Sequence, residues 1–239
     1  MRIDIIPCLQ DNYSYIITDE KNNTACVIDP SEAAPIAKFL RKENIELKYI
    51  LNTHHHFDHI GGNEDLKKEF KSIVVGFKED SKRIPGIEVL LEDDEIWKAE
   101  NFLAKIIHVP GHTTGHICFH FFKDQLVFTG DTLFSLGCGR IFEGTHEEMF
   151  LSLNKIKSLP EETKIYCGHE YTLNNANFCI KHDPENQNLK KRIELIKKQR
   201  ENGQPTIPIT IKDELNCNIF LRAKDLITFS KLRDLKDNF

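Results

Sequence analysis

The chain has 239 residues, a mass of 27.7 kDa and a formal net charge of −5. This length fits one domain, or one domain with a small appendage, and it can bury a sizeable core. The mild acidity argues against a general nucleic-acid binder, and no apolar run reaches the ~18–20 residues of a membrane span. Seven cysteines without a Cys-x-x-Cys pair, and no secretory signal, predict a cytoplasmic protein without a disulfide framework.

Short β-rich segments alternate with helical patterns over the first two thirds of the chain. Apolar residues at spacings of two, three or four and the turn residues between them define the segments. In chain order, the predicted elements are strands 3–6, 13–17 and 25–28, helix 31–44, strand 49–51, helix 62–70, strands 72–75, 88–90, 102–109, 116–122 and 126–128, helix 145–159, and strand 164–166.

The pattern of predicted secondary structure changes after residue 168. Residues 173–200 carry helical patterning, 203–208 form a break, and a further helix is predicted near 223–235. We therefore expect two domains, 1–170 and 171–239, with the change near residue 171. Mixed strands and helices followed by helices alone predict an α/β or α+β core with a small helical domain.

The segment His54-His55-His56-Phe57-Asp58-His59 follows a predicted strand directly. In an extended backbone His54 and His56 point the same way, because side chains alternate with a period of two. Asp58 and His59 follow where the chain turns toward a helix, so four potential ligands can converge on one small volume. Imidazole and carboxylate suit zinc and similar ions. His55 is expected to face the other side and not to bind a metal. The alternative is a polar, histidine-rich surface loop.

Three more candidates stand at the ends of predicted strands, each close to a glycine. They are His112, Asp131 and His169. Each is a weak signal alone, because an aspartate after glycine is usually a turn residue and a lone histidine is usually structural. Together they repeat one pattern, in which glycine permits a tight turn and presents a ligand-type side chain at the end of a strand.

These segments resemble the metallo-β-lactamase superfamily and, within it, the glyoxalase II (hydroxyacylglutathione hydrolase) family. The resemblance covers the chain nearly end to end. The segments that carry it are DNYSYII at 11–17, VIDPSEA at 27–33, THHHFDHIGG at 53–62, VPGHTTGH at 109–116, FTGDTLFSLGCGRIFEGT at 128–145, GHEYTLNN at 168–175 and LRDLKDNF at 232–239. It implies an αββα four-layer sandwich with a small C-terminal α-helical domain.

The resemblance also implies a binuclear metal site. His54, His56 and His112 would hold one ion, Asp58, His59 and His169 the other, and Asp131 would bridge both. Asp29 would support a ligand histidine from behind; the alternative, a turn aspartate beside Pro30, stays open. The ions would be divalent; zinc is expected, and iron or manganese also suits these ligands.

The implied reaction is the hydrolysis of S-(R)-lactoylglutathione to D-lactate and glutathione, the second step of methylglyoxal detoxification. A hydroxide bridging the two metals would be the nucleophile and Asp58 would orient it, so no protein nucleophile is needed. A thiolate with a pKa near ~8.5 can leave without a strong general acid.

By the same resemblance, five residues would contact the glutathione moiety: Arg140, Phe142, Tyr171, Arg233 and Lys236. Glutathione has two carboxylates, which suit Arg and Lys. Some family members carry Lys and Tyr where this chain has Arg140 and Phe142. Arg140 keeps the charge, whereas Phe142 lacks the hydroxyl and one hydrogen bond to the peptide.

The expected partner is a small-molecule substrate, with no nucleic acid and no membrane, and we expect a monomer. Three alternatives remain open from the sequence. The first is another hydrolase with the same metal core, such as a lactonase, another thioesterase, a β-lactamase or a persulfide-oxidising iron enzyme. The second is a nuclease, against which the net charge of −5 argues. The third is a metal-binding protein without catalytic activity.

Overall fold

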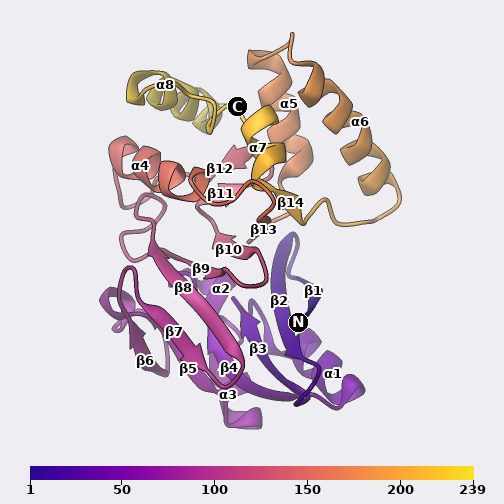
Figure 1. Cartoon of the computed structure of the whole chain (residues 1–239), viewed down its shortest axis with the longest axis vertical. Coiled ribbons are helices and arrows are strands. Elements are labelled where there is room, and N and C mark those ends of the chain that lie inside the picture. The colour runs from indigo at the N-terminus through magenta and orange to yellow at the C-terminus, as the bar shows by residue number, and fades with distance from the viewer. The chain divides into compact units, whose positions relative to one another are not determined.

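The structure is a computed structural model that describes all residues from Met1 to Phe239 (Figure 1). The chain divides into two compact units. Unit 1 comprises Met1–His108 with Gly115–Asp124, and unit 2 comprises Val109–Thr114 with Gln125–Phe239. The predicted domains, 1–170 and 171–239, stay a prediction.

A six-stranded sheet forms the first layer of unit 1. Its strands are β1 (Arg2–Cys8), β2 (Asn12–Asp19), β3 (Thr24–Ile28), β4 (Glu46–Leu51), β5 (Ile73–Phe77) and β6 (Ile87–Leu91), in that order. The pairs from β1 to β3 are antiparallel and those from β3 to β6 are parallel. Because β3 and β4 are parallel, their carboxyl ends meet at one edge, where Asp29 and the segment 52–59 begin.

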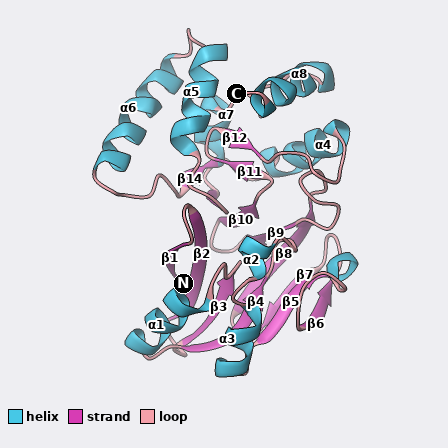
Figure 2. Ribbon diagram, turned by 180° about the vertical axis from the view of Figure 1, so that it is seen from behind, coloured by secondary structure: helices cyan, strands magenta, loops and turns pink.

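Two helices cover one face of this sheet, α1 (Ala33–Glu43) and α3 (Asn63–Phe70) (Figure 2). Their apolar faces bury Ile36, Leu40 and Leu66 in one cluster with Val27 and Ile50. Burial of each such side chain is worth about 1.5–3 kcal/mol, so this layer holds the strand edge rigidly. Along the chain, the one-turn helix α2 (Phe57–Ile60) and the glycines 61 and 62 come just before α3.

A second set of strands in unit 1 faces the other side of the sheet. It consists of β7 (Ile96–Ala99), β8 (Phe102–His108) and β9 (Ile117–Phe121), paired antiparallel. Tyr49 on β4 contacts Trp97 on β7 and Phe102 on β8 through edge-on rings, with centroids 5.4 and 6.3 Å apart. The two layers therefore pack face to face within unit 1, and the single tryptophan lies in this core.

Unit 2 contains β10 (Leu126–Gly130), β13 (Lys164–Cys167) and β14 (Ile209–Thr210), with β10 parallel and β14 antiparallel to β13. A two-stranded hairpin, β11 (Leu133–Phe134) with β12 (Gly137–Cys138), follows β10. The helices are α4 (His146–Lys157), α5 (Thr172–His182), α6 (Gln187–Glu201), α7 (Ile211–Cys217) and α8 (Leu226–Asp237).

The helical patterning predicted for 173–200 corresponds to two helices, α5 and α6. The chain breaks after His182 at Asp183 and Pro184, and Asn186 caps the second helix by accepting a hydrogen bond from the Leu189 amide. Proline removes a backbone donor and restricts the preceding residue, which ends a helix there. The short elements α2, α7, β7, β11, β12 and β14 were not predicted, because segments this short carry too little periodicity.

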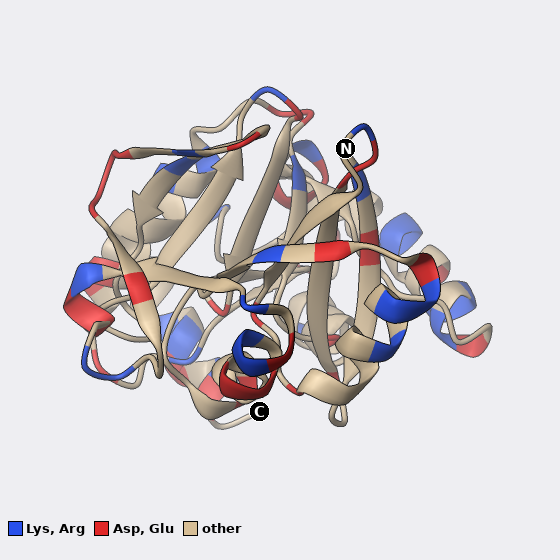
Figure 3. Ribbon diagram, turned by 90° about the horizontal axis from the view of Figure 1, so that it is seen from below, with Lys and Arg blue, Asp and Glu red and all other residues tan.

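Charged residues lie mainly on helices and loops, and the strands are largely uncharged (Figure 3). Strands β2, β3, β9 and β10 are buried along their whole length. No helix of the structure combines the length and the apolar composition that a membrane crossing requires.

Candidate metal centre

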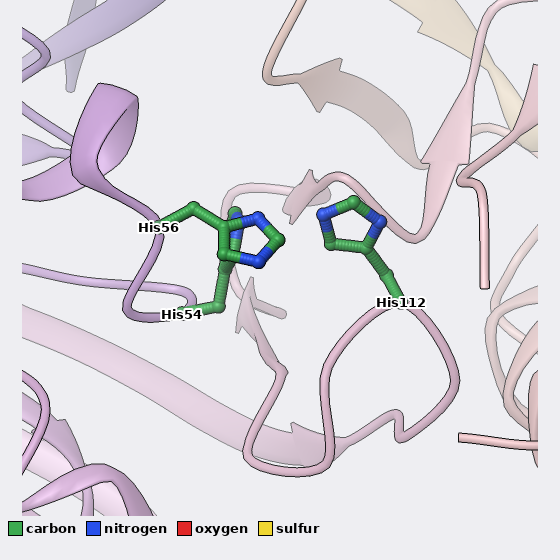
Figure 4. A group of neighbouring side chains, drawn as sticks. All are labelled: His54, His56 and His112. Carbon is green, nitrogen blue, oxygen red and sulfur yellow. The ribbon is translucent and has the colours of Figure 1, made fainter. Parts of the chain in front are cut away.

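Unit 1 presents four ligand-type side chains directly after β4. His54 is fully buried, His56 has the extended backbone of a helix N-cap (φ −60°, ψ 142°), and Asp58 and His59 lie in α2. The rings of His54 and His56 have centroids 4.7 Å apart, and those of His54 and His59 are 4.2 Å apart. The predicted convergence within this segment is therefore present. Figure 4 shows His54 and His56 on the segment after β4, and His112 on the loop after β8.

Asp29 is the buried acceptor behind these histidines. It directly follows β3 in the left-handed conformation (φ 46°), which aspartate tolerates better than most residues. Its carboxylate accepts hydrogen bonds from the Thr53 amide (2.7 Å), the Thr53 hydroxyl (2.6 Å) and His59 Nδ1 (3.0 Å). The sequence left open whether Asp29 is a turn residue or a support for a histidine. The structure shows both features: Asp29 has the backbone conformation of a turn residue, and its carboxylate bonds to the ring of His59.

These contacts select the tautomers of two histidines. An ionised carboxylate only accepts, so His59 Nδ1 carries the proton and Nε2 keeps its lone pair. The Thr53 hydroxyl donates its hydrogen bond to Asp29. It therefore accepts a hydrogen bond from His54 Nδ1, 3.0 Å away. Both rings therefore present Nε2 as a donor atom for a metal, which is the state that a ligand histidine needs. Asp29, His54 and His59 together form a group that could hold an ion.

Replacing Asp29 by asparagine is expected to weaken metal binding by roughly 10–100-fold. In one orientation the amide NH2 meets the Thr53 amide, and the hydrogen bond to that backbone donor is lost. In the other it meets His59 Nδ1, which drives His59 toward the wrong tautomer. Competition with a coloured chelator measures the affinity, and circular dichroism checks the fold. An unchanged affinity would show that Asp29 is a turn residue only.

Asn12 is a site residue that the sequence analysis missed. Its side-chain amide donates to the Asp58 carboxylate (2.9 Å) and to the Asp58 backbone carbonyl (3.1 Å). Asp58 is thereby held with Oδ2 at 3.5 Å from His59 Nε2. The signal available in the sequence was the position of Asn12 in the turn that opens β2, but nothing local links it to a residue 46 positions away.

Unit 2 brings together the other three candidates. His112 Nδ1 donates to the Arg140 carbonyl (2.8 Å), which again leaves Nε2 as the donor atom for a metal. Asp131 Oδ2 lies 3.5 Å from His112 Nε2 and 3.3 Å from His169 Nε2. All three side chains are buried. The three side chains thus offer a carboxylate and two imidazole nitrogens, which are ligand types that zinc accepts, and the role of Asp131 as a shared ligand stays a prediction.

Gly139 allows the backbone to pack closely against Asp131 and His112 in unit 2. A side-chain carbon there would come within 1.9 Å of the Asp131 carbonyl oxygen and 3.2 Å of His112 Nδ1. Only glycine permits this approach of backbone to backbone.

The remaining histidines have other surroundings. His55 Nδ1 bonds to Asp80 (3.2 Å), and its orientation away from the ligand side stays a prediction. His116 stacks on His54 with centroids 4.6 Å apart. His120 is buried, and this burial, followed by the charge of Lys105, lowers the pKa of its ring. His108 stacks on Phe77.

Three of the five predicted substrate contacts lie at the surface of unit 2. Arg140 is exposed, with its guanidinium 5.8 Å from the centre of the Phe142 ring. Phe142 is 61% exposed and its ring meets His112 edge-on. Tyr171 stacks flat on His169, with centroids 4.6 Å apart. Phe142 and Tyr171 thus contact the candidate ligands His112 and His169, and the side chains of Arg140, Phe142 and Tyr171 are exposed.

Arg233, a predicted substrate contact, is buried, with only 4% of its surface exposed. Its guanidinium donates to the Cys138 carbonyl (2.7 Å), the Gly139 carbonyl (3.3 Å) and the Asp237 carboxylate (2.9 Å). Arg233 therefore fixes the segment that approaches Asp131. A contact between Arg233 and substrate stays a prediction.

Lys236 lies three residues further along α8. Its ammonium donates to the Asn174 side chain and lies over the rings of Phe178 (5.3 Å) and Phe239 (5.0 Å). Burial, and next the charge of Arg233, lowers the pKa of Lys236 to about 8. A partly desolvated ammonium attracts an anion more strongly than one in bulk water does.

Two family models match the chain. Residues 9–169 match the Metallo-beta-lactamase superfamily, and residues 170–239 match the Hydroxyacylglutathione hydrolase C-terminus. Among solved structures, ETHE1 from Myxococcus xanthus has a TM-score of 0.75 at 23% identity, covering 98% of this chain and 90% of that one. The BLEG-1 B3 metallo-beta-lactamase has a TM-score of 0.71 at 24% identity, covering 92% and 99%. The fold and the histidine–aspartate set are thus those of a metallo-β-lactamase-type protein, and the predicted αββα class is confirmed.

Relatives with higher sequence identity over the full chain identify the family within this superfamily. The chain is 64% identical to a hydroxyacylglutathione hydrolase of Pelagibacter ubique over 239 residues, which is 100% of both chains. It is 42% identical to one of Crocosphaera subtropica, again over 100% of both chains. The chain therefore belongs to the hydroxyacylglutathione hydrolase family of the metallo-β-lactamase superfamily, which confirms the resemblance seen in the sequence.

Proposed function

We propose that this chain is a metal-dependent thioester hydrolase that converts S-(R)-lactoylglutathione and water to D-lactate and glutathione. The observation that carries the proposal is the 64% identity over the full length with a hydroxyacylglutathione hydrolase. The match of residues 170–239 to the C-terminal model of that family supports a glutathione substrate over a lactam or a lactone.

We propose that the two sets of ligands serve two divalent ions. His54, His56 and His112 would hold one ion, and Asp58, His59 and His169 the other, as two of the possible ion-binding groups of the structure suggest. Asp131, close to His112 Nε2 and His169 Nε2, would contribute to both. The donor chemistry fits, because His54, His59 and His112 each donate from Nδ1 to an acceptor, which makes Nε2 the unprotonated nitrogen that a metal needs. We expect zinc, and iron or manganese also suits a histidine–carboxylate set.

When bound, such ions lower the pKa of water to near ~7 and stabilise an oxyanion. The protein's own part is to position the groups around the thioester. Asp58, held by Asn12, can accept a hydrogen bond from the attacking water and turn its lone pair toward the carbonyl carbon. The leaving thiolate has a pKa near ~8.5, so the site needs no strong acid beside the sulfur.

We further propose that residues 171–239 bind the glutathione moiety and that residues 1–170 carry the chemistry. Arg140, Tyr171 and Lys236 are accessible and offer two cations and a hydroxyl to a dicarboxylate peptide. Phe142 supplies an apolar face in place of a hydroxyl donor. The predicted role of Arg233 would be to contact the same ligand from its buried position.

Replacing Lys236 by alanine is expected to raise the KM for S-lactoylglutathione roughly 10–150-fold, because a hydrogen bond to a charged group is worth about 1.5–3 kcal/mol. The value of kcat and the metal content should stay unchanged, since Lys236 touches no candidate ligand. Steady-state kinetics with metal analysis measures this. Lys231→Ala, an exposed lysine of the same helix, is the control. An equal KM in the two variants would remove Lys236 from the binding site.

Two further parts of the proposal concern the state of the protein in the cell. All seven cysteines are buried free thiols, which supports a reducing compartment such as the cytoplasm. We propose a monomer, and light scattering during gel filtration should give a mass near the 27.7 kDa of one chain.

The test of function compares three substrates on one purified sample of known metal content. S-lactoylglutathione should be hydrolysed much faster than a lactone or a β-lactam. Removing the metal with a chelator should abolish turnover, and adding zinc back should restore it. Faster lactone or lactam hydrolysis would assign another hydrolase of the superfamily. Full turnover by verified metal-free protein would refute the mechanism.

A further inference from the structure

Asp80 is a buried carboxylate that the proposed chemistry does not use. It ends the short 3-10 helix Lys78–Asp80 after β5 and has no exposed surface. Asp80 Oδ1 accepts from Arg83 Nε (3.0 Å) and from Arg83 Nη2, and Asp80 Oδ2 lies 3.2 Å from His55 Nδ1. An unpaired buried charge is costly, so these partners keep the carboxylate in one place.

His55 is the histidine between two candidate ligands. It is in none of the groups of side chains that could hold an ion, and a carboxylate only accepts, so His55 Nδ1 donates to Asp80 (3.2 Å). The peptide bonds on either side of His55 join it directly to His54 and His56. Any rotation of the backbone at His55 therefore changes the direction of both ligand side chains. The Asp80 bond opposes that rotation.

Asp80 also lies against a second segment. A side-chain carbon at Gly115 would come within 2.1 Å of Asp80 Oδ1 and 2.4 Å of Asp80 Cγ, so the carboxyl group contacts bare backbone there. The next residue, His116, stacks on His54 at 4.6 Å with an interplanar angle of 20°. The backbone amide of Ile117 then donates to the Thr53 carbonyl (2.9 Å). Asp80 is thus packed between the two segments that enclose the ring of His54.

We propose that Asp80, itself fixed by Arg83, is a positioning residue that sets the direction of His54 and His56 through His55. The proposal rests on the metal site of the proposed function, but not on its substrate. A support of this kind behind a ligand changes metal affinity by roughly 10–100-fold when it is removed.

The test measures zinc affinity by chelator competition in Asp80→Ala, His55→Ala and His55→Asn. The first two variants should bind one zinc ion roughly 10–100-fold more weakly, with kcat lowered and KM nearly unchanged. His55→Asn should stay near the wild-type affinity, because the asparagine Nδ2 can donate to Asp80 in place of the imidazole Nδ1. The double variant Asp80→Ala/His55→Ala should be no weaker than Asp80→Ala, since the two residues act as one unit.

The matched control is the exposed pair His146–Asp234, which has a similar contact of 3.0 Å. Asp234→Ala should leave zinc affinity unchanged. The proposal is wrong if His55→Asn binds zinc as weakly as His55→Ala, or if the losses of the double variant add. Should Asp80→Ala fail to fold, the comparison of the two His55 variants decides alone. Absence of thioester turnover in the wild type would contradict the proposed function, while the zinc comparison would still test Asp80.

Discussion

Replacing Asp131 by asparagine is expected to lower kcat roughly 100–1,000-fold, which is the scale of losing one electrostatic contact at a reacting centre. The shape of the side chain is conserved, but its negative charge is lost beside His112 Nε2 and His169 Nε2, at 3.5 and 3.3 Å. The amide NH2 or its weaker acceptor oxygen then replaces the carboxylate that we propose two cations share. The variant should also bind fewer than two ions per chain.

Two measurements check this expectation, the turnover of S-lactoylglutathione at saturating zinc and the metal content of dialysed protein. Asp94→Asn is the control, because Asp94 forms an exposed pair with Lys105 and also has a positive φ that asparagine tolerates. A full metal complement together with wild-type kcat in Asp131→Asn would show that Asp131 is not a shared ligand.

Replacing Glu214 by glutamine is expected to remove the contribution of this side chain to the pH dependence of the free energy of unfolding. Glu214 is fully buried on α7, and burial raises its pKa to about 7, although hydrogen bonds from Asn218 and the Leu136 amide oppose the rise. The folded chain therefore keeps this proton at a pH where the unfolded chain has lost it. Stability must fall as the pH rises from about 4.5 to 7, and Glu214 contributes about 3 kcal/mol to that fall.

The measurement is urea unfolding at fixed zinc between pH 5 and 8. The free energy of unfolding of the wild type, relative to Glu214→Gln, should decrease by up to about 3 kcal/mol over this range, because other titrating groups cancel in the difference. Glu185→Gln, at an exposed glutamate, should show a constant difference. A constant difference for Glu214→Gln as well would contradict the assignment.

Glu214 matters because it holds the segment between Asp131 and Arg140. Its carboxylate accepts from the Leu136 amide (2.9 Å), and Leu136 has a positive φ of 59°. Asn218 on the same helix donates to the Gly137 carbonyl (3.1 Å). A leucine in the left-handed region is strained, so these long-range hydrogen bonds must supply the order that the local sequence lacks.

The sequence by itself determined which residue types are available to bind metal. His54 and His56 follow from a period of two after a strand, and His112, Asp131 and His169 follow from strand ends near glycine. Those are local patterns, and within each unit the structure brings their side chains together. The αββα class also followed from sequence, because segments that resemble one family extend along the whole chain.

Only the tertiary structure decided what lies behind those side chains. It showed that Asp29 supports His59, that Asn12 holds Asp58, and that Arg233 is buried instead of free at the surface. Each of these contacts joins residues that are between 30 and 95 positions apart. The physical reason is that periodicity encodes which way a side chain faces along its own element, whereas its partner depends on how elements distant in sequence pack.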